Sequence, residues 1–162
     1  MIRPLSYVII QLHSIMEKVV LPNEVLLGEV ARLLGEGREV VMTPKGRSML
    51  PFIRGEVDRI KLRKTDKLRV GDIVLAYFEK RYVLHRIVAI NGEEFTLMGD
   101  GNLKDVEHGK RNDVVGKVVE IITPDDRQHK PRKAWLWRHT LFLRKYLLMI
   151  YRKWIKLTSK QY

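Results

Sequence analysis

Three side chains of this sequence have the types that nucleophilic catalysis requires: the hydroxyl of Ser48, the imidazole of His85 and the carboxylate of Asp100. Ser48 lies within residues 46–51, GRSMLP. The glycine before it permits tight backbone geometry, and the proline after it discourages a regular strand. A catalytic serine needs such a turn, which exposes its hydroxyl and directs a backbone N–H at the developing oxyanion. Taken alone, however, a serine between glycine and proline is more often part of an ordinary turn.

The other two residues also have a plain structural alternative. His85 interrupts an apolar run over residues 82–88 and is either a hydrogen-bonded sheet histidine or a general base on a rigid strand. Asp100 lies among the turn residues of the segment 99–102, GDGN, which alone indicates a surface turn. Its functional interpretation is a carboxylate that orients His85 and stabilises the imidazolium.

The order of five segments favours the functional interpretation. GRSMLP (46–51), VGDIVLAY (70–77), VLHRIV (83–88), LMGDGN (97–102) and DVVGKV (113–118) follow one another along the chain. This arrangement resembles the peptidase superfamily that contains signal peptidase I and the LexA-type self-cleaving repressors. The resemblance covers two-fifths to half of the chain, and it is the order and spacing together that make it specific.

The resemblance implies roles for individual residues. Ser48 corresponds to the nucleophile, and His85 takes the position of the general base, which is lysine in bacterial signal peptidases and histidine in the archaeal and endoplasmic-reticulum branch. Asp100 corresponds to the Gly-Asp motif after the base and ranks first as the orienting acid. Because the Ser–His branch has a further acid a few positions later, Asp105 and Glu107 are alternatives. Asp72 is expected to be structural.

We therefore expect a serine endopeptidase that cleaves leader or signal segments through an acyl-enzyme. The resemblance implies a polypeptide substrate that docks as an added β-strand, with small residues before the scissile bond. One alternative is a non-catalytic module that keeps the fold and binds a membrane or nucleic acid through its basic tail. Another is a self-cleaving regulator, although no Ala-Gly or Cys-Gly bond near the N-terminus would serve as its cleavage site.

These residues must be positioned by a mainly β domain. Strands are expected near residues 39–43, 57–63, 72–78, 82–90, 94–98 and 114–122, with a hairpin at Asn91-Gly92. Their close spacing predicts a mainly antiparallel sheet or a partly closed barrel. The resemblance implies that this partly closed antiparallel domain is signal-peptidase-like. Apolar spacing predicts N-terminal helices over residues 5–20 and from Asn23 to a stop at Gly35 and Gly37. The expected divisions are an N-terminal helical segment (1–37), a peptidase domain (38–123) and a C-terminal helix (124–162).

Charge is distributed unevenly along the 162 residues. The net charge is +12, but all 19 acidic residues lie at or before Asp126, and the first 126 residues also hold 20 Lys and Arg. The other 11 basic residues follow Asp126 without a single acid. A basic amphipathic helix is expected over residues 134–156, with its apolar face either packed on the β domain or placed on an anionic membrane. No helix-turn-helix pattern precedes the domain, so we expect no nucleic-acid partner.

Composition excludes several other chemistries. The chain has no cysteine, which rules out disulfides, a thiol nucleophile and cysteine metal sites. Its five histidines form no HExxH or other close pair, so no metal or cofactor is expected. No apolar stretch is long enough to cross a bilayer, and we expect a cytoplasmic protein or one peripheral on the cytoplasmic membrane.

Overall fold

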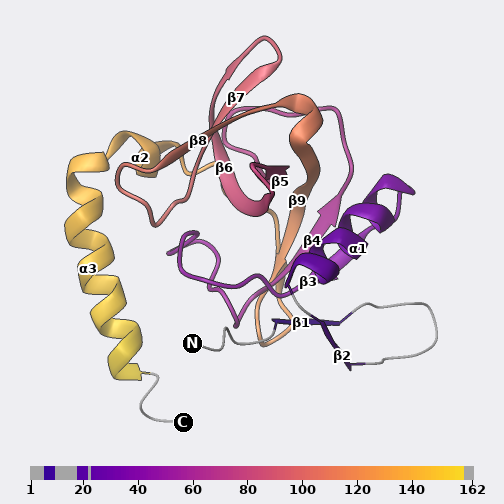
Figure 1. Ribbon diagram of the computed structural model, residues 1–162. Helices are drawn as coiled ribbons and strands as arrows, with labels where there is room; N and C mark the ends of the chain where they lie inside the picture. Colours follow the sequence, from indigo (N-terminus) through magenta and orange to yellow (C-terminus); the bar gives the residue numbers. More distant parts are fainter. Residues whose placement is uncertain (1–5, 10–17, 22, 159–162) are drawn as a thin grey trace.

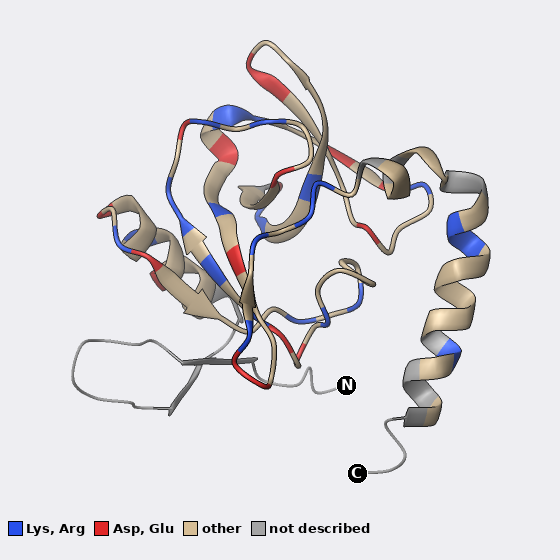
Figure 2. Cartoon of the chain, turned by 180° about the vertical axis from the view of Figure 1, so that it is seen from behind, with Lys and Arg blue, Asp and Glu red and all other residues tan. Residues whose placement is uncertain are grey.

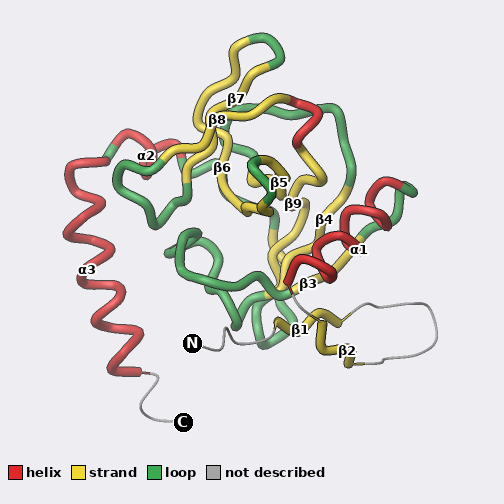
Figure 3. The backbone as a smooth tube through the Cα atoms, in the orientation of Figure 1, coloured by secondary structure: helices red, strands yellow, loops and turns green. Residues whose placement is uncertain are grey.

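The computed structural model describes residues 6–9, 18–21 and 23–158. It is mainly β, and its largest element is an eight-stranded sheet whose strand pairs are all antiparallel. The strand order is β3-β4-β9-β5-β6-β7-β8, with β10 paired to β9. The sheet curves but does not close, because β3 and β8 remain at its ends (Figures 1 and 3). The expected antiparallel β domain is thus confirmed at this level.

All six expected strands are present, within about two residues of their expected bounds. The sheet consists of β3 (Val40–Met42), β4 (Arg59–Arg63), β5 (Ile73–Phe78), β6 (Arg81–Asn91), β7 (Glu94–Met98), β8 (Val106–Lys110), β9 (Val114–Ile122) and β10 (Gln128–His129). A 3₁₀ turn, η1 (Arg111–Asp113), precedes β9. Strand β8 was not expected because its sequence, VEHGK, has no buried apolar alternation. It forms because its backbone pairs with the edge of β7.

Two tight hairpins fix the register around β6. Asn91-Gly92 lies at the β6–β7 hairpin as expected, but Asn91 pairs with Glu94, and Gly92 alone of this turn has a positive φ, +59°. The turn between β5 and β6 has positive φ at both central residues, Glu79 (+51°) and Lys80 (+60°), as in a type I′ turn. These turns hold the central strand β6 between two antiparallel partners.

Helix α1 (Asn23–Gly35) covers one part of the sheet and confirms the second expected helix. Its apolar face, which includes Val30 and Leu34, is buried in the main core with residues of β3, β4, β5 and β9. A Cβ at Gly116 of β9 would lie 2.9 Å from a methyl group of Leu34, so glycine lets the helix approach the sheet closely. Gly37, with φ +81°, ends the helix as the sequence predicted.

The helix expected over residues 5–20 is wrong where the structure describes it. Strands β1 (Ser6–Ile9) and β2 (Lys18–Leu21) pair with each other as an antiparallel ribbon (Figure 1). The apolar spacing fits either element, and both segments contain β-branched residues, which favour strands. Residues 10–17 of that expectation lie outside the described residues.

The C-terminal helix expected over residues 134–156 is two helices, α2 (Trp135–His139) and α3 (Leu141–Thr158). The chain bends at Thr140, whose hydroxyl donates to the carbonyl of Trp137. The guanidinium of Arg144 donates to that same carbonyl. Two side chains therefore donate to a carbonyl that, in a continuous helix, would accept from the backbone N–H four residues later. Among the described residues, no helix is both long and apolar enough to cross a membrane.

Candidate active site

Ser48 lies in a tight turn that the surrounding core holds in place. The N–H of Leu50 donates to the carbonyl of Arg47 at 3.3 Å, which makes Ser48 and Met49 the central residues of the turn, hereafter the 47–50 turn. Met49 and Leu50 are buried, whereas Ser48 is only half-buried. Gly46, just before the turn, has φ +87°. Apolar anchors on one side and a permissive glycine on the other thus hold the turn in place and leave Ser48 partly exposed.

A second turn, residues 99–102, lies directly against the backbone of the first. The N–H of Gly101 donates to the carbonyl of Ser48 at 2.7 Å. A Cβ at Gly101 would be 2.6 Å from the carbonyl oxygen of Arg47, and one at Gly99 would be 2.6 Å from that of Ser48. Both glycines are therefore required by close backbone approach. The GDGN segment therefore packs against the 47–50 turn and is not a surface turn.

His85 projects from β6 toward the same place. Its Nδ1 lies 2.8 Å from Oε2 of Glu107 on β8, and both side chains are at least nine-tenths buried. A Cβ at Gly99 would lie 3.0 Å from His85 Nε2 and 2.6 Å from the Ser48 carbonyl oxygen. Glu107 contacts Nδ1, so Nε2 is the ring nitrogen that remains available, and it lies beside the 47–50 turn. Gly99 has no side chain that would separate Nε2 from this turn.

Asp100 serves a different partner. Its two carboxylate oxygens accept hydrogen bonds from Arg86 Nε at 2.8 Å and Nη2 at 2.6 Å. Arg86 is 0% exposed and Asp100 is 2% exposed, and Arg86 also donates to the carbonyls of Gly71 and Arg132. Asp100 is part of a buried ion pair that joins the 99–102 turn to β6 and to the segment before α2.

This geometry corrects the ranking made from the sequence, in which Asp100 came before Glu107. His85 and Arg86 are consecutive in β6, so their side chains leave on opposite faces of the strand. Asp100 meets the face that carries Arg86, and Glu107 meets the face that carries His85. Asp105 is exposed. Strand alternation favours this division, but only the unexpected strand β8 makes Glu107 available.

Asp72 has the structural position that was expected. Its carboxylate accepts from the N–H of Arg69 at 2.9 Å and lies 3.2 Å from Nζ of Lys117. It therefore closes the turn before β5 and links that turn to β9.

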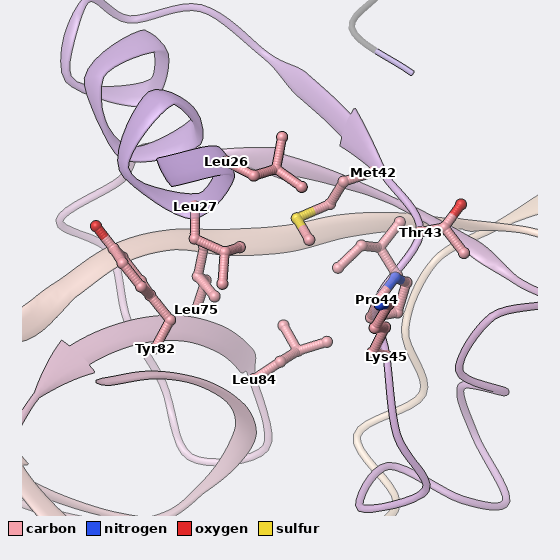
Figure 4. Close-up of a pocket in the computed structure, with 10 residues that line it drawn as sticks. Leu26, Leu27, Met42, Thr43, Pro44, Lys45, Leu75, Tyr82 and Leu84 are labelled. Atoms are coloured by element: carbon pink, nitrogen blue, oxygen red, sulfur yellow. The ribbon is translucent and has the colours of Figure 1, made fainter. Parts of the chain in front are cut away.

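Ser48 and His85 both line one pocket of about 210 Å³, between the segment that leads to the 47–50 turn and the start of β6. An apolar recess of about 170 Å³ adjoins it, lined by residues from α1, β3, β5 and β6 (Figure 4). Pro44, Lys45, Tyr82 and Leu84 line both cavities. Desolvation raises the pKa of Tyr82, and Tyr77 beside it adds to that shift, so the phenol stays neutral. A cavity of about 150 Å³ admits a benzene-sized group, so the recess has room for an apolar side chain.

The C-terminal helices attach to the 99–102 turn through two side chains. Trp137 Nε1 donates to the carbonyl of Asp100 at 2.9 Å, and its ring contacts Phe52 edge-on. Arg144 Nη1 donates to the carbonyl of Asn102 at 3.0 Å. Arg144 is 2% exposed, and this desolvation lowers its pKa, an effect that nearby Asp100 opposes and Arg86 reinforces. Trp137 and Arg144 thus attach the tail to the β domain, whereas most of the apolar face that was expected either to pack there or to contact a membrane is exposed.

No other described histidine lines the pocket that holds Ser48 and His85. His108 lies beside Thr96, His129 and His139 are exposed, and His13 falls outside the described residues. Among the residues that the structure describes, no cluster of three or more His, Asp or Glu could hold a metal ion. The chemistry available at the site is that of a hydroxyl, an imidazole and a carboxylate.

The chain matches no protein-family model, and no curated protein matches it.

Proposed function

We propose that this protein is a serine endopeptidase of the signal peptidase type, in which Ser48 is the nucleophile, His85 the general base and Glu107 the carboxylate that orients it. The proposal depends mainly on one observation. Glu107 holds Nδ1 of a buried histidine whose Nε2 lies beside the turn that carries Ser48. A carboxylate in this position fixes the tautomer in which Nε2 is unprotonated, and it stabilises the imidazolium once that nitrogen takes a proton.

The first half of the reaction forms an ester and releases an amine. The Ser48 hydroxyl gives its proton to His85 Nε2 as its oxygen attacks the carbonyl carbon of the peptide. The backbone N–H of Ser48 is the proposed donor to the resulting oxyanion. When the tetrahedral intermediate collapses, the C–N bond breaks and His85 returns the proton to the leaving nitrogen. The acyl group then remains on Ser48.

The second half regenerates the enzyme with water. His85 Nε2 takes a proton from a water molecule, and the hydroxide attacks the ester carbonyl. Collapse breaks the bond to the Ser48 oxygen, which recovers a proton from the imidazolium. The product is a carboxylic acid, and both side chains return to their starting states.

The pocket suggests how a peptide would bind. An extended substrate in the space between residues 44–48 and β6 would bring its scissile carbonyl to Ser48. In an extended chain, side chains two residues apart point to the same face. One of them can therefore occupy the Ser48 pocket while the other enters the apolar recess. We expect a small residue at the scissile bond and an aliphatic residue in the recess.

The test is labelling and cleavage of the full chain. A serine-directed inhibitor should add its mass to the peptide that contains Ser48, and Ser48→Ala should abolish both that labelling and the cleavage of small-residue peptides. Glu107→Gln should impair cleavage, while its neighbour Asp105→Asn, exposed on the same segment, serves as the matched control. Labelling that persists in Ser48→Ala would overturn the proposal. Peptide binding without turnover, unchanged by Ser48→Ala, would identify a non-catalytic module instead.

A further inference from the structure

Helix α3 has one face packed on the domain. Arg144 and Leu148 are buried and Tyr151 is half-buried, and their spacing of four and three residues places them on one side of the helix. Arg144 contacts the 99–102 turn. Burial raises the pKa of Tyr151, which also interacts electrostatically with the Arg54–Asp58 ion pair. This face accounts for how α3 is held along the side of the β domain (Figure 1).

A second face of α3 is apolar and exposed. It consists of five large side chains with spacings of four, three, four and three residues: Leu143, Leu147, Ile150, Trp154 and Leu157. Such spacing forms a continuous stripe along a helix, here called the apolar stripe. Its members are between 46% and 64% exposed, which is unusual for so many large apolar residues in one line. In the part of the chain that the structure describes, these side chains keep about half or more of their surface exposed, so the stripe points to a partner.

Two partners would suit an apolar stripe of this spacing: a second copy of the helix, or a lipid surface. Helices that pair along such a seam usually place acidic and basic residues along its flanks. Residues 127–162 contain 11 Lys and Arg and no Asp or Glu, and Figure 2 shows only basic charges along α3. Pairing two copies would bring like charges together. An anionic bilayer instead buries the stripe and attracts the cations.

We propose that α3 binds the surface of an anionic lipid bilayer, with the apolar stripe in the boundary between headgroups and acyl chains. The helix would lie in the plane of the surface, with basic residues such as Lys145 and Lys153, both exposed, near the headgroups. This binding requires neither Ser48 nor His85 and is independent of the proposed peptidase activity. Because Arg144 attaches α3 to the 99–102 turn, a bound helix would hold the Ser48 pocket close to the membrane.

The test uses the full chain carrying Ser48→Ala, so that its outcome does not depend on turnover. Co-sedimentation with vesicles of phosphatidylcholine and phosphatidylglycerol should show binding that weakens with added salt, and vesicles of phosphatidylcholine alone should bind far less. Ile150→Gln should lower the affinity about tenfold, the loss expected for removing one buried aliphatic side chain. Val25→Gln on α1 is the matched control, because Val25 is 57% exposed and Ile150 is 64% exposed.

Two further measurements control for folding and for charge. Thermal unfolding should show that Ile150→Gln and Val25→Gln fold equally well, and Lys145→Gln/Lys153→Gln should weaken vesicle binding without changing the stripe. Absence of vesicle binding, or equal binding by Ile150→Gln and Val25→Gln, would overturn the proposal. A dimer in sedimentation velocity that Ile150→Gln dissociates would assign the stripe to a second copy of the chain.

Discussion

Replacing Asp100 by asparagine would separate the structural carboxylate of this site from Glu107, the carboxylate that we propose orients His85. The substitution keeps the size of the side chain and removes its charge, while Arg86 remains 0% exposed and positively charged. Of the two short hydrogen bonds in the ion pair, asparagine can accept only one. The carbonyls of Gly71 and Arg132 still receive Nη1, so part of the guanidinium stays satisfied.

The expected cost follows from burial. Removing one partner of a buried ion pair destabilises a protein by about 3–5 kcal/mol, and the retained hydrogen bonds place Asp100→Asn near 3 kcal/mol. For a chain of 162 residues this corresponds to a fall in melting temperature of roughly 6–12 °C. Thermal melts followed by circular dichroism, together with urea unfolding followed by tryptophan fluorescence, measure it.

Glu107→Gln is the matched comparison, since it also exchanges a carboxylate for an amide beside β6. Glu107 is also largely buried, but its partner is an imidazole rather than a permanent charge, and glutamine can still accept a hydrogen bond from Nδ1–H, so we expect a stability change of at most about 1 kcal/mol. The rate of peptide cleavage should instead fall by a factor on the order of 10³ to 10⁴, because glutamine cannot stabilise the imidazolium. If Asp100→Asn melts like the unmodified protein and loses activity while Glu107→Gln remains active, our division of roles is incorrect.

Three other predictions concern the same site. Gly99→Ala should lower the free energy of unfolding and abolish most activity, because its methyl group would crowd the Ser48 carbonyl and His85 Nε2. Full activity in a peptidase assay would contradict this close approach. The rate at which a serine-directed inhibitor acylates Ser48 should be lower in acid, because a protonated imidazole cannot accept a proton, and a rate independent of pH would argue against His85 as the base. Trp137→Phe should lower the free energy of unfolding by about 1–3 kcal/mol, because the carbonyl of Asp100 loses its donor, and urea unfolding would show an unchanged midpoint if that bond were unimportant.

Local patterns in the sequence determined much of this protein. The alternation of apolar residues and the turn residues between them predicted β3, β4, β5, β6, β7 and β9, and the capping signals around Asn23 and Gly37 predicted α1. These features were predictable because they depend on residues close together in the chain. Residues 5–20 show the limit of such patterns, since the same apolar residues form strands once two segments can pair.

The tertiary structure decided which side chains meet. The sequence singled out Ser48, His85, Asp100 and Glu107, but it could not divide the two carboxylates between the histidine and Arg86. That division depends on the strand face from which each side chain leaves and on β8, a strand that exists because β7 has an edge to offer. Likewise, only packing showed that Arg144 of the basic tail is buried against the 99–102 turn while the apolar stripe of α3 faces outward, because residues distant in sequence compete for the same contacts.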